Sequence, residues 1–190
     1  MSRHDSALLV VDVQTKLLHA MSPPPTLVWN IGRLIDGAHM LEIPVEATEQ
    51  YPKGLGTTTR VLAQRLGEIP SKLMFSCREC GQLFERWRDR GIHKILVAGI
   101  ETHVCVQQTV LDLLAAGFQV YVAVDAVGSR YAVDRDTALR RMEMSGATLT
   151  TTEAALFEWC EVAGTPEFKR VSALVRETPP LSDLPPGDVG

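Results

Sequence analysis

The sequence predicts an α/β fold with a mostly parallel sheet, because short apolar runs alternate with segments of helical spacing along the whole chain. The first run, 7–13, is almost continuously apolar, which is typical of a parallel strand that is covered on both faces. Right-handed crossovers then place the carboxyl ends of all strands at one edge of the sheet. In open α/β sheets, ligands bind at that edge.

Six segments have the length and composition of strands, and they cover 7–13, 44–48, 72–76, 95–100, 119–125 and 147–151. Helical spacing is found at 27–41, 58–66, 82–90, 104–116, 134–145, 153–162 and 166–175. The chain has no internal repeat. We therefore expect a single domain over residues 1–178, followed by a flexible Pro-rich tail over residues 179–190.

The composition is that of an ordinary globular protein, with 190 residues of which 45% are hydrophobic and 22% are charged. The net charge is −4 and no long basic stripe is present, which argues against nucleic acid as a partner. The sequence has no signal-peptide layout and no apolar stretch of membrane-spanning length. We therefore expect a cytoplasmic protein that does not bind membranes.

Cys105 has the most informative position in the chain, because it falls in the first turn of a predicted helix, directly after the buried strand 95–100. A helix N-terminus favours negative charge. The position therefore predicts that the pKa of the Cys105 thiol is lower than usual and that the thiolate is reactive. A buried and inert cysteine is the alternative interpretation.

Two further residues can complete a nucleophilic site at the same edge. Asp12 stands at the end of the first strand and can accept the thiol proton, and Lys72 begins the short third strand and can stabilise the thiolate. Backbone N–H groups at the start of the Cys105 helix can form an oxyanion hole. Taken singly, Asp12 is equally well interpreted as a structural residue, and a lysine such as Lys72 is more often a surface residue than a catalytic one.

Further residues near this edge are predicted to line a substrate pocket, and they are Gln14, Glu49, Tyr51, Phe75 and His103. His103 is close to Cys105 in the sequence, but such near neighbours at a helix start point apart, so we assign it to the pocket wall. Cys77 and Cys80 form a C-x-x-C pair. Because no second Cys/His pair accompanies it, it cannot form a four-ligand zinc site, and a redox role is a minor alternative.

Three motifs resemble the Asp–Lys–Cys signature of the isochorismatase-like cysteine hydrolase superfamily, and they are LLVVDVQ with Asp12, SKLMFS with Lys72 and GIETHVCVQQT with Cys105. The resemblance extends from residue 7 to about residue 175, and TEQYPKGLG and PEFKRVSAL resemble its isochorismatase domain-containing branch. It implies a three-layer α/β/α, Rossmann-like fold with a six-stranded parallel sheet in the order 3-2-1-4-5-6. It also implies a homodimer or homotetramer.

The resemblance further implies a cis peptide bond between Ile100 and Glu101 and an oxyanion hole formed by the backbone amides of Glu101 and Cys105. Nicotinamidases of this superfamily hold a metal ion with an Asp and two His after the second strand. The corresponding segment here, TEQYPKGLGTTT, contains no histidine. We therefore expect no metal ion and no other cofactor.

Together these features predict a metal-independent hydrolase of a small molecule, in which Cys105 attacks an amide, ester or related C–N or C–O bond. Two alternatives stay open. One is cleavage of an enol ether, as in true isochorismatases, which does not require the cysteine. The other is a non-catalytic binding or scaffold protein that keeps the fold.

Overall fold

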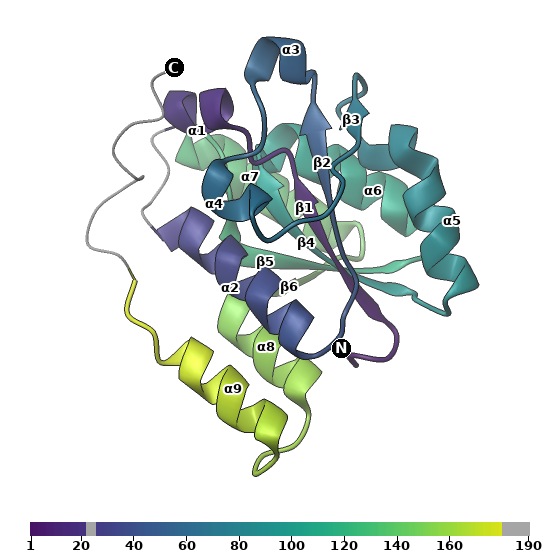
Figure 1. Ribbon diagram of the computed structural model, residues 1–190. Helices are drawn as coiled ribbons and strands as arrows, with labels where there is room; N and C mark the ends of the chain where they lie inside the picture. The colour runs from purple at the N-terminus through teal and green to yellow at the C-terminus, as the bar shows by residue number, and fades with distance from the viewer. Residues whose placement is uncertain (22–25, 180–190) are drawn as a thin grey trace.

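The centre of the protein is a six-stranded sheet in the order β3-β2-β1-β4-β5-β6, and all of its strand pairs are parallel (Figure 1). The computed structural model describes residues 1–21 and 26–179. The strands are β1 (Ser6–Val11), β2 (Val45–Gln50), β3 (Ser71–Lys72), β4 (Lys94–Ile100), β5 (Gln119–Gly128) and β6 (Thr148–Thr150). The predicted fold class and strand order are confirmed.

Helices cover both faces of this sheet (Figure 1). They are α1 (Thr15–Met21), α2 (Thr26–Met40), α3 (Pro52–Leu55), α4 (Arg60–Ala63), α5 (Gly81–Asp89), α6 (Gln107–Ala115), α7 (Ala132–Met144), α8 (Thr152–Cys160) and α9 (Pro166–Val175). Helices α2, α8 and α9 pack together on one face, and α5, α6 and α7 lie on the other. Two short turns complete the chain, the 3-10 turn η1 (Cys77–Cys80) and the π-helical turn η2 (Thr102–Val106).

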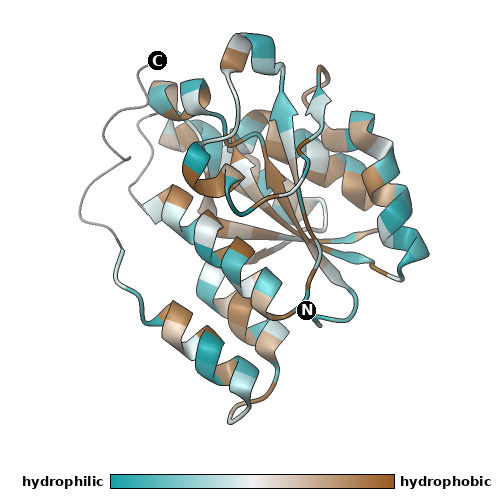
Figure 2. Cartoon of the chain, in the orientation of Figure 1, coloured by the Kyte–Doolittle hydropathy of each residue, from teal (hydrophilic) through white to brown (hydrophobic). Residues whose placement is uncertain are grey.

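The sheet separates two hydrophobic cores, because successive side chains of each strand point to opposite faces. In β1, Leu8 and Val10 belong to the core beneath α2, whereas Ala7, Leu9 and Val11 belong to the core beneath α5 and α6. Figure 2 shows hydrophobic residues concentrated along the central strands. This burial on both faces explains the nearly continuous apolar run of the first strand.

The third strand is shorter than the sequence predicts. Residues 73–76 leave the sheet, and Lys72 is therefore the last residue of β3 and not the first residue of a longer strand. The reason lies in the backbone amides of Leu73 and Met74, which donate to the Glu79 carboxylate. The apolar segment looks like a strand in the sequence, but its hydrogen bonds go elsewhere.

Other boundaries differ from the sequence-based prediction as well. The helix expected over 104–116 begins with the π turn η2, and only from Gln107 onwards is it α-helical. The short helices α1 and α3 were not expected, and α4 is shorter than the predicted 58–66 segment. Of the expected Pro-rich tail, residues 180–190 lie outside the described residues.

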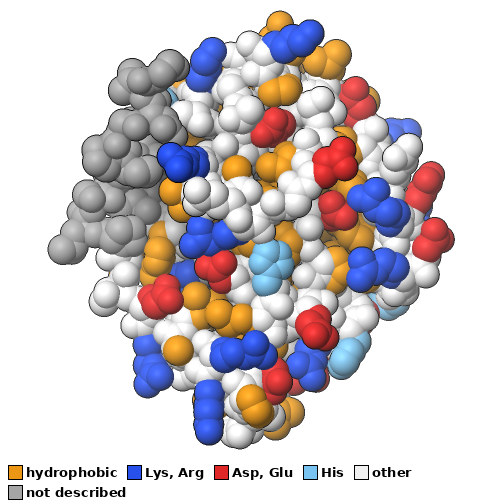
Figure 3. Space-filling view, in the orientation of Figure 1, with side chains coloured by type: hydrophobic (Ala, Val, Ile, Leu, Met, Phe, Trp, Pro, Cys, Tyr) orange, Lys and Arg blue, Asp and Glu red, His pale blue; other side chains and the backbone are white. Residues whose placement is uncertain are grey.

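The surface carries charges of both signs. On the face shown in Figure 3, acidic and basic side chains are interspersed and do not gather by sign. Within residues 1–21 and 26–179, no helix combines the length and the apolar character that a membrane span requires.

Candidate active site

Asp12 and Lys72 form a buried ion pair at the carboxyl edge of the sheet. Asp12 directly follows β1 and Lys72 ends β3. The distance between Lys72 Nζ and Asp12 Oδ2 is 2.6 Å, and both side chains are completely buried. A buried ion pair is costly to desolvate, so such a pair is retained only with close geometry and further hydrogen bonds.

The backbone at Asp12 is held in an unusual conformation. Its φ is 52°, in the left-handed region that residues other than glycine rarely adopt. On the adjacent β4, Gly99 has φ +126°, and a Cβ there would lie 2.1 Å from the carbonyl oxygen of Val11. Glycine thus allows β4 to run past the end of β1 next to Asp12. Strained backbone of this kind is concentrated at functional sites.

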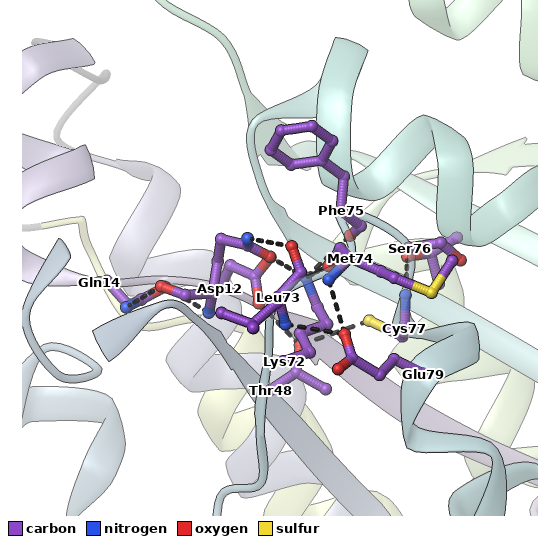
Figure 4. A network of polar contacts seen from close by, with 12 residues as sticks. Asp12, Gln14, Thr48, Lys72, Leu73, Met74, Phe75, Ser76, Cys77 and Glu79 are labelled. Carbon is purple, nitrogen blue, oxygen red and sulfur yellow. Dashed lines mark hydrogen bonds and ion pairs between the residues drawn. The ribbon is translucent and has the colours of Figure 1, made fainter. Parts of the chain in front are cut away.

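The Lys72 ammonium is surrounded by oxygen acceptors (Figure 4). Besides Asp12, its Nζ donates to Gln50 Oε1 at 3.0 Å and to the backbone oxygens of Phe75 at 2.8 Å and Met74 at 3.3 Å. Burial acts to lower the pKa of Lys72, but Asp12 and the neighbouring thiols outweigh it and raise the pKa above its usual value. Lys72 is therefore a fixed positive charge.

Cys105 lies in η2, directly after β4, and only 4% of it is exposed. Its pKa is raised and not lowered, which corrects the expectation from its position near a helix start. Burial raises the pKa most, the Asp12 carboxylate raises it further as a charge and as a hydrogen-bond partner, and the opposing effect of Lys72 is smaller. The resting side chain is thus a neutral thiol with a proton acceptor beside it.

A second thiol, Cys77, lies in the same cluster, which the sequence did not indicate. Cys77 is fully buried, its Sγ lies 3.3 Å from Thr48 Oγ1, and its N–H donates to Thr109 Oγ1 at 3.0 Å. Burial and the nearby Asp12 carboxylate raise the pKa of Cys77 to about 12. Cys77 and Cys80 are free thiols in the structure. The weak sequence signal was the FSC segment, which is separated from Lys72 by two residues.

The buried Gln14 and Glu49 hold the backbone around the site. Gln14 Nε2 donates to the backbone oxygens of Gln50 and Gly56, and its Oε1 accepts from Gln50 N at 2.8 Å. Glu49 Oε1 accepts from Thr58 N at 2.6 Å. These contacts fix residues 56–58 against the ends of β1 and β2. Direct contact of either side chain with a substrate stays a prediction.

Tyr51 and Phe75 are about half exposed, at 50% and 51%, and both follow strands at the edge that holds Asp12 and Lys72. This placement suits residues of a pocket rim. A role in substrate binding stays a prediction for both.

Glu101 and His103 form a partly buried polar group at the end of β4. Glu101 Oε1 lies 2.9 Å from Arg130 Nε, and Glu101 Oε2 lies 3.8 Å from His103 Nε2. His103 Nδ1 is 3.0 Å from Ser129 Oγ. The Ile100–Glu101 peptide bond is cis, as the resemblance implies. The oxyanion hole formed by the Glu101 and Cys105 amides stays a prediction.

A metal-binding cluster is not evident in the part of the chain that the structure describes. No three His, Cys, Asp or Glu side chains there are grouped so that they could hold a metal ion.

The family model described as the isochorismatase domain matches residues 6–154. The chain is 39% identical to isochorismatase domain-containing protein 2 of Homo sapiens, with 94% of this chain and 87% of the relative covered. It is 37% identical to the secreted isochorismatase effector Isc1 of Phytophthora sojae, with 92% and 86% covered.

Two solved structures are similar over almost their whole length. The MAR1 ribonuclease from Caenorhabditis elegans has a TM-score of 0.87 and 40% identity, with 97% of this chain and 98% of that chain covered. YcaC from Pseudomonas aeruginosa, solved with hexane-2,5-diol and covalent acrylamide, has a TM-score of 0.83 and 25% identity, with 92% and 90% covered.

Proposed function

The chain belongs to the isochorismatase family of hydrolases, and from the buried side chains of Asp12, Lys72 and Cys105 we propose that it cleaves an amide or ester bond in a small molecule by nucleophilic attack of Cys105. The observation that carries this proposal is the 2.6 Å ion pair between Lys72 and Asp12, which sits beside a neutral thiol. A nucleophile, a proton acceptor and a fixed positive charge are the groups that covalent hydrolysis requires.

In the first half of the proposed reaction, the Cys105 sulfur attacks the carbonyl carbon while its proton moves to the Asp12 carboxylate. Lys72 stabilises the negative charge that develops on the sulfur as the proton leaves. The backbone amides of Glu101 and Cys105 hold the carbonyl oxygen. The tetrahedral intermediate then expels the leaving group, which takes the proton from Asp12. A thioester on Cys105 remains.

In the second half, a water molecule attacks the thioester carbon and gives a proton to Asp12. The carbon–sulfur bond breaks, the acid product departs, and the proton returns from Asp12 to the sulfur. Asp12 thus acts as a base in each attack and as an acid in each departure. The raised pKa of Cys105 suits this cycle, because the thiol gives up its proton only during the attack.

Several side chains at the mouth of the site suit a substrate with an apolar part. Tyr51, Leu73, Met74 and Phe75 are each at least half exposed, although their side chains are hydrophobic or aromatic. Exposed apolar groups that gather in one place mark binding surfaces. Gln14, Glu49 and His103 would supply polar groups on the pocket wall.

The covalent acrylamide in the YcaC structure supports a reactive nucleophile in this family. Acrylamide is an electrophile whose terminal carbon adds to thiols. We propose that Cys105 forms such an adduct in this chain. The rate of the addition would report how much of the thiol is present as thiolate.

The ribonuclease name belongs to the Caenorhabditis elegans protein. This chain has a net charge of −4, which gives little attraction for a phosphate backbone. We therefore keep a small molecule as the proposed substrate. A homodimer or homotetramer in the cytoplasm stays a prediction.

The proposal is tested by hydrolysis of p-nitrophenyl acetate, a small activated ester. Cys105→Ala should reduce the enzyme-dependent rate by at least about 100-fold, because the nucleophile is lost. Cys80→Ala is the matched control, since Cys80 is a half-buried thiol of the same segment as Cys77, and its rate should stay within about twofold of the wild type.

Two results would point to the alternatives. If Cys105→Ala keeps the rate of the wild type, the cysteine is not the nucleophile, and enol ethers become the substrates to test. If the wild-type protein hydrolyses neither the ester nor small amides, a binding or scaffold role is favoured.

A further inference from the structure

Glu79 is an exposed acid in the C-x-x-C segment, and the proposed reaction does not use it. It lies in the turn η1, and its Oε2 accepts two backbone hydrogen bonds, from Leu73 N at 2.7 Å and from Met74 N at 2.6 Å (Figure 4). One carboxylate oxygen thus fastens two successive amides of the loop that follows Lys72. Glu79 therefore fixes the backbone of this loop, although its own side chain is exposed.

The loop 73–75 depends on such hydrogen bonds because burial does not fix it. Leu73 is 70% exposed, Met74 50% and Phe75 51%. Hydrophobic side chains with that exposure contribute little to holding a backbone in one place. The loop is therefore held mainly through its polar backbone groups.

The opposite side of the same loop holds the catalytic lysine. The backbone oxygens of Met74 and Phe75 accept from Lys72 Nζ, and the Leu73 oxygen accepts from Gln50 Nε2 at 2.8 Å. The amides of the loop point to Glu79 and its carbonyls point to Lys72 and Gln50. Any shift of the loop away from Glu79 moves the oxygens that surround the ammonium group.

We propose that Glu79 is a positioning residue, which fixes loop 73–75 so that its carbonyl oxygens hold the Lys72 ammonium group in place beside Asp12 and Cys105. The inference rests on the proposed function, because it assigns to Lys72 the stabilisation of the Cys105 thiolate. It also gives the C-x-x-C segment a task that needs no redox chemistry.

Two observations indicate that Glu79 holds loop 73–75 firmly. The hydrogen bonds from Met74 and Leu73 lower the pKa of Glu79, so the carboxylate is charged at neutral pH, and charge-assisted hydrogen bonds are about twice as strong as neutral ones. The turn that carries Glu79 is itself anchored, because Cys77 is buried against Thr48 and Thr109.

The test compares Glu79→Ala and Glu79→Gln with the wild type. Three quantities are measured: the rate of acrylamide addition to Cys105 by mass spectrometry, the amide hydrogen exchange of residues 73 and 74, and the melting temperature. Glu85→Ala is the matched control, since Glu85 is an exposed acid on the adjacent helix α5. It should leave all three quantities unchanged.

Glu79→Ala should speed exchange at residues 73 and 74 by at least about tenfold and slow acrylamide addition about 5- to 10-fold, because a loosened Lys72 stabilises the thiolate less. Glu79→Gln keeps an acceptor oxygen in the same place, although its hydrogen bonds are weaker. In this variant both the exchange rate and the rate of acrylamide addition should therefore stay much closer to the wild-type values than in Glu79→Ala. A purely structural role would change the melting temperature and leave the rate of addition per folded molecule intact.

The inference fails if Glu79→Ala accelerates exchange but Cys105 reacts as fast as in the wild type, or if exchange does not change. Should Glu79→Ala not fold, Glu79→Ser takes its place, because a serine side chain is too short to bridge to the amides of residues 73 and 74. An exchange rate and a reaction rate that both equal those of the wild type would then overturn the proposal. Failure of the proposed function looks different, because Cys105→Ala would then hydrolyse p-nitrophenyl acetate as fast as the wild type, whatever the Glu79 variants do to exchange and labelling.

Discussion

Lys72→Met should abolish hydrolysis and destabilise the protein at the same time. Removal of one partner leaves the Asp12 charge buried without its ion pair, which costs about 3–5 kcal/mol of unfolding free energy in comparable buried pairs. Loss of the positive charge beside Cys105 should lower the rate of p-nitrophenyl acetate hydrolysis on the order of 100- to 1000-fold. Urea unfolding and the ester assay measure the two effects.

The double variant Asp12→Asn, Lys72→Met is the matched control for this result. It removes both charges, and so it should recover most of the lost stability while the hydrolysis stays abolished. If Lys72→Met alone is as stable and as active as the wild type, Lys72 neither stabilises the buried Asp12 charge nor takes part in the reaction.

Asp12→Asn should separate the reactivity of the thiol from catalysis. The Asp12 carboxylate raises the pKa of Cys105, so its removal should lower that pKa and increase the thiolate fraction. Acrylamide addition at about pH 7.5 should therefore become several-fold faster. Ester hydrolysis should become at least about 100-fold slower, because the proton acceptor is lost.

The pH dependence of acrylamide addition follows from the raised pKa of Cys105. In the wild type the pKa of Cys105 lies above its ordinary value, so the rate of acrylamide addition should rise steadily with pH through the alkaline range without levelling off. In Asp12→Asn the rise should begin at lower pH. Asp36→Asn, at a partly exposed carboxylate paired with Arg65, is the control and should follow the wild-type profile. Hydrolysis that keeps the wild-type rate in Asp12→Asn would argue against Asp12 as the base, and slower labelling would contradict its effect on the pKa of Cys105.

The parallel sheet and the place of Asp12 at its carboxyl edge could be predicted from the sequence pattern, whereas the order of the strands was implied by the resemblance to the superfamily. Asp12 interrupts an apolar strand at its carboxyl end, and parallel topology sends every such end to one edge. Cys105 follows another strand and reaches the same edge. The family motifs added Lys72, whose own position in the sequence is not distinctive.

Two features of the site depend on contacts that a sequence pattern does not encode. The segment Leu73–Phe75 is as apolar as a strand, and only the hydrogen bonds to Glu79 show that it is a loop. The direction of the Cys105 pKa shift depends on burial and on the distance to Asp12, which outweigh the benefit of a helix start. For the same reason the sequence pattern did not place Cys77 beside Asp12.

A covalent intermediate on Cys105 can be trapped chemically. The wild-type protein is mixed with p-nitrophenyl acetate, quenched in acid during turnover, digested and analysed by mass spectrometry. We expect an acetyl group on Cys105 that neutral hydroxylamine removes, as is typical of a thioester. An acetyl group found on Cys77, Cys80 or a lysine instead, or hydrolysis that proceeds with Cys105 unmodified and equally well in Cys105→Ala, would contradict this mechanism.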